Sequence, residues 1–233
     1  LKFYQEGSSK AIIPNVDEDL NQMILINTAG GITSGDKFST CIELDNSFLC
    51  TSSQAAEKIY KGLNNPGNIN VEINVKNNSC IYWLPQEMIL FNNCNIKRNI
   101  NVNISKCSNL LMCESIIFGR TSMKEKFTKG LYLDFWQISQ NEKLVHTEAL
   151  NTDGYDASVF SKVATFNSNC ALNTIIGVGE EILNKAEIIK KNLKENSMST
   201  SEISIWDEKL IIRTMSIDNY HLRFAVKNIL SYF

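Results

Sequence analysis

Hydrophobic and polar residues alternate in three segments of the chain that share one local pattern. Each segment has two apolar positions separated by a polar one, then a short polar turn, a serine and a second apolar run; the segments are residues 42–49, 73–83 and 102–112. Period-two alternation followed by Asn, Asp or Ser is typical of a strand that ends in a tight turn. Each segment is therefore predicted to be a hairpin-like strand, turn, strand unit.

The three units recur about every thirty residues between residues 20 and 150, which indicates a large all-β structure built in layers. A sandwich, a barrel and a β-helix all fit this recurrence, and the pattern does not separate them. Further strands are predicted at residues 23–27, 86–91, 131–139 and 144–150. The strand at 131–139 alternates cleanly, and its partner is expected to begin at Lys143 after a turn at residues 140–141.

The pattern changes after about residue 170. Residues 180–193 place apolar side chains on one side of a helix, with acidic residues at its start and lysines near its end. Residues 203–206 and 209–215 are predicted to form a hairpin, and residues 222–233 carry a second helical stripe. We therefore expect an all-β scaffold over residues 1–170 and a helix, hairpin, helix portion over residues 171–233, packed together as one structural domain.

Composition narrows the classes of partner. Of 233 residues 43% are hydrophobic and 21% charged, which is typical of a packed globular protein, and the net charge of −2 predicts binding to neither nucleic acid nor an anionic membrane. No apolar run reaches the roughly 20 residues of a membrane span, and no signal peptide pattern opens the chain. Together with seven cysteines that lack a Cys-x-x-Cys pair, this predicts a cytoplasmic protein with buried, reduced thiols. Because the chain begins at Leu1 and ends in an apolar stripe, we expect its natural ends to extend further.

The glycine-rich segment 28–36 is similar to a phosphate-binding loop but differs from one at the decisive position. Gly30 and Gly35 have the spacing of a P-loop, which then needs Lys followed by Ser or Thr; here Asp36 and Lys37 follow. A carboxylate thus stands where a phosphate would bind. We infer that these glycines, with Gly31, serve backbone geometry and that Asp36 has a purpose other than nucleotide binding.

Catalytic and metal-binding patterns are weak. His146 and His221 are the only histidines, and neither lies near a recognisable nucleophile motif, so no catalytic residue is predicted. Few histidines and unpaired cysteines also argue against a permanent metal site or cofactor. Carboxylates that line a channel can pass an ion without holding it. Four are candidates, with an ordinary surface or hydrogen-bonded role as the alternative for each: Asp36, Glu87, Glu114 and Glu148.

Two further strings are unusual for their composition. In residues 82–87 (Tyr-Trp-Leu-Pro-Gln-Glu), Pro85 is expected to end or kink the strand that carries Trp83, which leaves Gln86 and Glu87 at a strand junction. Residues 52–60 (Ser-Ser-Gln-Ala-Ala-Glu-Lys-Ile-Tyr) are small and polar after a strand. The simplest interpretation of residues 82–87 is a bend with a packed Trp, and that of residues 52–60 is a short connector.

Taken in order, four strings resemble the successive motifs of the UreD (UreH) family of urease accessory proteins. They are residues 28–36, residues 52–60 with Gln54 and Tyr60, residues 83–91, and residues 114–120 with Gly119 and Arg120. The resemblance implies a mainly β, β-helix-like fold with a small C-terminal helical portion. It also implies a non-enzymatic metallochaperone component that binds UreF, recruits the GTPase UreG through UreF, and docks on apo-urease to help nickel enter.

An internal tunnel is the route proposed for nickel in this family, so the resemblance implies transient Ni²⁺ passage. It makes Asp36 and Glu148 the best candidates for carboxylates on that route. The sequence departs from the family where Ser34-Gly35 replaces Gly-Gly and where Lys61 replaces Arg.

Two alternatives stay open at this point. One is a β-helical or β-sandwich ligand-binding module that uses exposed tryptophans as stacking platforms. The other is a hydrolase with Asp36 and Glu148 as an acid/base pair in one cleft. Association with UreF separates the accessory-protein hypothesis from both.

Overall fold

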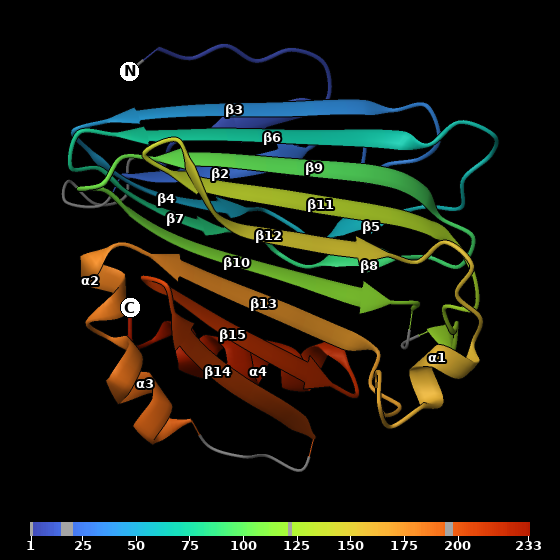
Figure 1. Ribbon diagram of the computed structural model, residues 1–233. Coiled ribbons are helices and arrows are strands. Elements are labelled where there is room, and N and C mark those ends of the chain that lie inside the picture. The colour runs from blue at the N-terminus through green and yellow to red at the C-terminus, as the bar shows by residue number, and fades with distance from the viewer. Residues whose placement is uncertain (1, 15–20, 121–122, 194–197) are drawn as a thin grey trace.

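Two β-sheets face one another and form most of the molecule. The computed structural model describes residues 2–14, 21–120, 123–193 and 198–233. Within these ranges, one sheet has ten strands and the other has five (Figure 1). The ten-stranded sheet contains β1 (Ser9–Ile12), β2 (Gln22–Asn27), β4 (Phe48–Ser53), β5 (Glu57–Ile59), β7 (Cys80–Leu84), β8 (Met88–Leu90), β10 (Asn109–Phe118), β13 (Ala171–Val178), β14 (Ser199–Trp206) and β15 (Lys209–Ser216). The five-stranded sheet contains, in order, β12 (Lys143–Asn151), β11 (Leu131–Gln140), β9 (Asn95–Ile104), β6 (Gly67–Lys76) and β3 (Lys37–Asp45).

The chain winds between the two sheets as a solenoid of stacked coils. Lys37 pairs with Asn68, and Asn68 pairs with Lys97, in parallel register, so the coils are 31 and 29 residues long. The predicted β-helix-like fold and its period are confirmed. The description of each unit as hairpin-like is wrong, because its two strands lie in different sheets and pair with the next coil instead. This arrangement lets the apolar residues of both strands face each other across one interior.

A ladder of serines holds the corners between the sheets in register. The backbone N–H of Ser47 donates to Ser79 Oγ at 3.1 Å, and that of Ser79 donates to Ser108 Oγ at 3.3 Å. Ser79 and Ser108 are fully buried. Asn46 and Asn77 precede the first two of these serines with φ of 45° and 50°, a left-handed conformation that Asn tolerates better than most residues. The serine noted in each sequence unit is thus the residue that stacks one coil on the next.

The apolar core fills the space between the sheets, and a second core lies under the helices. Leu110 and Met112 of β10 face the solenoid interior, whereas Leu111 and Cys113 face the opposite side. Strand β10 is therefore buried on both faces, which explains its continuous apolar sequence. Of the cysteines expected to be buried, Cys94 and Cys113 are, but Cys41 and Cys107 are exposed; Cys41 lies in the outward phase of β3, and Cys107 lies in a turn.

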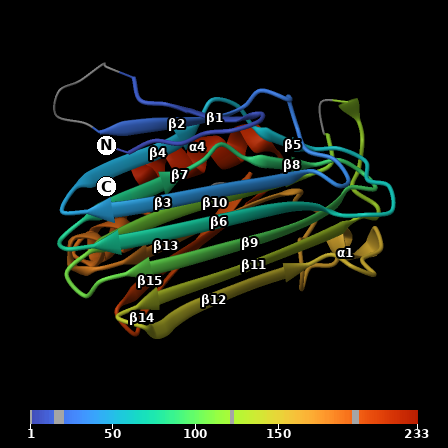
Figure 2. The same cartoon turned by 90° about the horizontal axis from the view of Figure 1, so that it is seen from above.

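The C-terminal strands continue the ten-stranded sheet beyond β10 in the order β13, β15, β14, all antiparallel. Helix α4 (Asn219–Leu230) packs on the far face of this sheet from the five-stranded sheet (Figure 2). Helix α1 (Ser158–Ser161) lies before β13 in the chain.

These elements test several of the sequence predictions. The predicted hairpin and last helix are confirmed as β14–β15 and α4. The predicted helix at 180–193 is instead two helices, α2 (Glu180–Leu183) and α3 (Ala186–Asn192), and β13 was not predicted at all. The strand predicted at 86–91 is shorter, since only Met88–Leu90 pair as β8. The partner predicted for 131–139 does begin at Lys143, as β12.

Candidate functional site

A cluster of charged and aromatic side chains is buried between the two sheets. Arg98 of β9 forms two hydrogen bonds with Asp134 of β11, at 2.8 and 2.6 Å, and one with Glu114 of β10 at 2.6 Å. Trp83 Nε1 of β7 donates to Glu114 Oε1 at 2.7 Å, and Tyr132 Oη donates to Asp134 Oδ2 at 2.7 Å. None of the five side chains is more than 5% exposed. The cluster joins both sheets, because Arg98 lies in one and Glu114 in the other.

The electrostatics of this interior cluster favour one fixed arrangement. Burial acts to lower the pKa of Arg98, but the carboxylates of Asp134 and Glu114 outweigh it and hold that pKa well above its ordinary value. Burial raises the pKa of Tyr132 well above its usual range, so its hydroxyl stays protonated and donates. Two carboxylates face one guanidinium, and each keeps a second neutral donor. Charges are tolerated in an interior only when they are paired and hydrogen-bonded in this way.

Arg98, Asp134 and Tyr132 were not identified from the sequence, although a signal for the two charged residues is present. Arg98 occupies the inward, otherwise apolar phase of β9, between Ile96 and Ile100. Asp134 occupies the same phase of β11. A charge in the apolar phase of a strand must find a buried partner, so these two positions could have been predicted to pair.

A second charged cluster lies where β12, the edge strand of the five-stranded sheet, approaches β15 of the other sheet. Arg213 of β15 donates to Glu148 Oε2 of β12 and to Thr174 Oγ1 at 3.3 Å. His146 Nε2 is 3.5 Å from the same Glu148 oxygen. Burial acts to raise the pKa of the Glu148 carboxyl, but His146 and Arg213 outweigh it and hold the pKa below its usual value. We call His146, Glu148 and Arg213 the rim cluster.

A row of polar residues connects the rim cluster with the interior cluster. Glu114 of β10 pairs in register with Thr174 of β13, and Thr174 pairs with Arg213 of β15. Directly paired residues on one face of a sheet have neighbouring side chains. Glu114 and Thr174 are buried, and Arg213 is half exposed. The ten-stranded sheet therefore carries a line of polar side chains from the interior cluster to the rim cluster.

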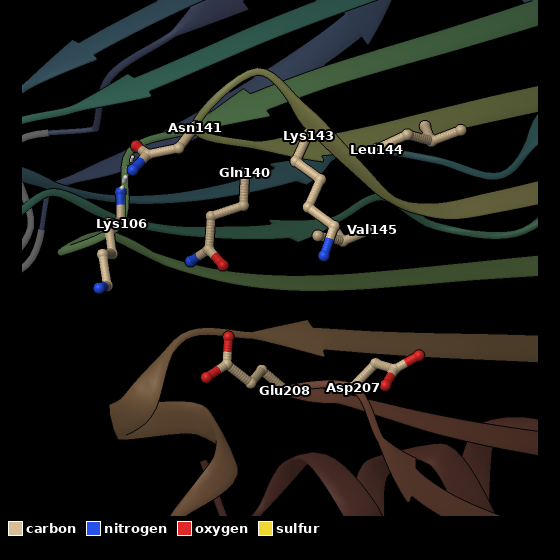
Figure 3. A pocket seen from close by; sticks show the side chains of 8 residues that line it. All are labelled: Lys106, Gln140, Asn141, Lys143, Leu144, Val145, Asp207 and Glu208. Carbon is tan, nitrogen blue, oxygen red and sulfur yellow. Dashed lines mark hydrogen bonds between the residues drawn. The ribbon is translucent and has the colours of Figure 1, made fainter.

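A hollow of about 560 Å³ lies between the start of β12 and the β14–β15 turn. Figure 3 shows Lys106, Gln140 and Lys143 on one side of it, across from Asp207 and Glu208 in the β14–β15 turn. Asn141 and, from strand β12, Leu144 and Val145 complete the lining, and the Val145 carbonyl accepts a hydrogen bond from Lys209 Nζ of β15 at 2.6 Å. The two sheets are thus bridged on this side by long, charged side chains.

Glu87 lies at the junction between β7 and β8 on the face covered by helix α4. Strand β7 ends just before Pro85, so the predicted interruption there is confirmed. Glu87 is buried and accepts hydrogen bonds from Asn219 Nδ2 at 2.7 Å and from Arg223 Nε at 3.0 Å. Arg223 also donates to Gln86 Oε1 at 2.7 Å. The junction is thereby tied to α4.

Asp36 closes the glycine-rich turn. Its Oδ2 accepts the backbone N–H of Thr33 at 2.9 Å. Gly30 and Gly35 have φ of +77° and +83°, which favours glycine. A Cβ on Gly31 would lie 2.3 Å from the ring of Tyr60, whose hydroxyl donates to the Gly30 carbonyl at 3.2 Å. The glycines are thus required by backbone conformation and by the close approach of Tyr60.

The remaining motif residues also have structural contacts. The backbone N–H of Gln54 donates to the Leu25 carbonyl at 2.9 Å. Gly119 follows β10 with φ of +83°. Arg120 pairs with Glu125 at 2.5 Å and lies 4.3 Å from the ring centre of Phe91.

The four candidate carboxylates do not share one site. Glu114 and Glu148 belong to the clusters joined by the polar row, whereas Glu87 faces α4. Asp36 directly precedes β3, the opposite edge of the five-stranded sheet from β12. Three strands separate β3 from β12, a gap of about 19 Å at the usual strand spacing. The alternative of a hydrolase with Asp36 and Glu148 in one cleft is therefore wrong.

The alternative of a tryptophan-lined binding surface also loses most of its support. Trp83 and Trp136 are buried, and only Trp206 is exposed to a large extent. In the described ranges, no group of three or more His, Cys, Asp and Glu side chains could hold a metal ion. Nor is any helix of that part of the chain long and apolar enough to cross a membrane.

The fold and these clusters define a class of protein: a two-sheet β-solenoid scaffold with buried ionic bridges between its sheets. Comparison with known sequences gives the family. The sequence model described as "UreD urease accessory protein" matches residues 1–233. The chain belongs to the UreD urease accessory protein family, which supports a role in urease maturation.

Individual relatives agree with this assignment. The chain is 31% identical to the urease accessory protein UreD of Rhizobium leguminosarum bv. viciae, over 95% of the chain and 81% of that protein. It is 31% identical to UreD of Rhizobium leguminosarum bv. trifolii, over 99% of the chain and 84% of the relative. It is 29% identical to UreD of Agrobacterium fabrum, over 99% and 80%.

Proposed function

We propose that this protein is a non-enzymatic scaffold that helps nickel enter apo-urease, in a cytoplasmic complex with UreF and, through UreF, with UreG. Membership of the UreD family supports the role in urease maturation. The partners and the cargo follow from the sequence resemblance. In this proposal nickel passes through the protein without being retained, and no resident cofactor takes part.

The polar row from Glu148 to Glu114 is the observation that best supports passage of an ion through the fold. An apolar interior would exclude a divalent ion, because removing its hydration shell costs far more than dispersion contacts return. Carboxylates along a polar row offset that cost. Arg98 pairs with Glu114, and Arg213 pairs with Glu148, so a cationic side chain balances each carboxylate. We infer that an ion would enter by displacing the Arg213 guanidinium from the Glu148 carboxylate.

Reconstituted urease activation tests this function. Apo-urease, UreF, UreG, GTP and Ni²⁺ are combined with or without the purified chain, and nickel bound to urease is measured by mass spectrometry. We expect little nickel to be loaded without the chain. Equal loading without it, or failure to co-purify with UreF, would reject the proposed function.

Two variants examine the route itself. Glu148→Ala is expected to lower nickel loading while the protein stays folded, and Glu43→Gln, on the exposed outward phase of β3, is the matched control. Asp36→Ala is also expected to lower loading, but through the turn that Asp36 closes, so its folding is measured in parallel. Normal activation by both Glu148→Ala and Asp36→Ala would reject a role for either carboxylate in nickel loading.

A further inference from the structure

The imidazole of His146 lies in the rim cluster, near the Glu148 carboxylate but too far from it for a normal hydrogen bond. Its side chain is 9% exposed, so about nine-tenths of it is buried. Its Nε2 has no hydrogen-bond partner among the described residues, and the 3.5 Å to Glu148 Oε2 is longer than an N–H···O hydrogen bond. A buried nitrogen without a partner is costly and rare, which indicates that a water or an ion belongs beside it.

The spacing of His146 and Glu148 fits two ligands of one metal ion. The residues are two apart on β12, so both side chains project from the same face of the strand. Two ligand atoms at about 2.1 Å from a metal lie roughly 3.4 Å apart at a tetrahedral angle and roughly 3.0 Å apart at a right angle. The observed 3.5 Å is therefore within a small side-chain movement of a chelate, and the backbone need not move.

Arg213 occupies the place that such an ion would take. Its guanidinium pairs with Oε2 of Glu148, the same oxygen that faces His146. Its side chain is 45% exposed, so it can move into solvent, and exposed ion pairs contribute little stability. By contrast, Arg98 in the interior cluster is held by two carboxylates and has no such freedom.

We propose that His146 and Glu148 form a weak binding site for a divalent ion of the nickel and zinc class, with Arg213 as its displaceable counter-ion. The inference rests on the proposed function, in which nickel is the cargo, and it assigns ligands to one point of the route. Imidazole favours nickel, copper and zinc over magnesium and calcium, which prefer oxygen ligands. Only two protein ligands are present and water completes the coordination, so exchange is fast, as cargo requires.

Equilibrium dialysis of the full chain against NiCl₂, without urease or other accessory proteins, tests the site. His146→Gln and Glu148→Gln are each expected to lower nickel affinity by about tenfold or more. His221→Gln is the matched control, because His221 also lies beside a carboxylate, Asp218, but is in helix α4. Excess Mg²⁺ is expected not to displace nickel. Unchanged affinity in His146→Gln, or an equal loss in His221→Gln, would overturn the proposal.

Arg213→Gln distinguishes a metal site from a purely structural bridge. Removing the competing cation is expected to raise nickel affinity by roughly fivefold, since a positive charge next to a dication opposes binding. A structural bridge predicts unchanged or weaker binding. Thermal unfolding of each variant confirms that it is folded, and an unchanged or lower nickel affinity in folded Arg213→Gln would contradict the role of this residue.

The wild-type protein offers a readout that needs no variant. With only two histidines in the chain, imidazole NMR signals of His146 and His221 can be followed separately during addition of Ni²⁺. Paramagnetic broadening is expected first at His146, and broadening first at His221 would reject the site. If nickel does not bind at His146, the result of the activation experiment still stands and only this site is rejected. If nickel binds at His146 but urease is activated equally well without the protein, only the proposed function is rejected.

Discussion

The interior cluster and the rim cluster contain similar charges but differ in how completely the charges are satisfied. Arg98 is 5% exposed and contacts two carboxylates, each of which also accepts a neutral donor. Arg213 is 45% exposed, and the imidazole beside its carboxylate partner has a nitrogen without a hydrogen-bond partner in the described part of the chain. Burial thus separates two tasks. The interior pairs join the two sheets, and the more exposed rim pair is the one that exchanges its partner in our proposal.

Removing the interior cation should have the largest effect. Arg98→Met leaves Glu114 and Asp134 buried without their cation, and we expect a loss of about 3–5 kcal/mol in the free energy of unfolding. Urea denaturation followed by circular dichroism measures it. Arg213→Met in the rim cluster is the matched comparison, with a change below about 1 kcal/mol. Similar losses in both variants would contradict the distinction between the clusters.

The two buried tryptophans differ in whether their indole N–H is hydrogen-bonded, so they test how much a single satisfied bond in the interior contributes to stability. Trp83 Nε1 donates to Glu114, whereas Trp136 Nε1 has no partner among the described residues. Trp83→Phe is expected to cost about 1–3 kcal/mol more than Trp136→Phe, because only the first change leaves a buried acceptor unsatisfied. Equal costs in urea denaturation would mean that side-chain volume, and not the bond to Glu114, sets the loss.

Glu87 and Arg223 form a pair of intermediate character, since Glu87 is buried and Arg223 is half exposed. Glu87→Gln is expected to cost about 1–2 kcal/mol, because hydrogen bonds to a charged acceptor become weaker neutral ones. Faster amide hydrogen exchange in α4, with little change in β9, would show that the pair holds the helix. Uniformly faster exchange would contradict a local role.

The pair at the start of α4 should show the smallest effect. Asp218 caps the helix by accepting the His221 N–H at 2.9 Å, and Asp218→Ala is expected to cost about 1 kcal/mol, with Asp218→Asn close to wild type. Burial acts to raise the pKa of Asp218, but the bonds from His221 outweigh it and hold the pKa below its usual value. The charged cap therefore stabilises the fold above the unfolded pKa of about 3.9, and this contribution is lost as pH falls through the lower folded pKa. A cost for Asp218→Ala that does not shrink in acid would count against this assignment.

Much of the fold was predictable because alternation within a strand is a local property. The three repeated units, their period of about thirty residues and the strands at 131–139 and 144–150 were all found from it. Strand β13 was missed because it is buried on both faces and has no alternation to detect. The break between α2 and α3 was missed because the apolar stripe continues across residues 184–185.

The candidate sites were only partly predictable. Glu87, Glu114 and Glu148 were selected from motifs, but their cations Arg98, Arg213 and Arg223 were not, since 16 to 136 residues separate each carboxylate from its partner. No local pattern carries such pairings. The charges in the apolar phase of β9 and β11 were overlooked; they indicate that a buried pair is needed, but not that Glu114 of the other sheet joins it.

The sequence by itself determined the coil period, the positions of the turns, the glycines of the 28–36 turn and the family of this protein. These features depend on residues near one another in the chain or on motifs in a fixed order. The tertiary structure alone decided that Glu114, Thr174 and Arg213 form one row, and that Asp36 and Glu148 lie at opposite edges of a sheet. Strand order and register set those distances, because they decide which inward positions meet across the interior.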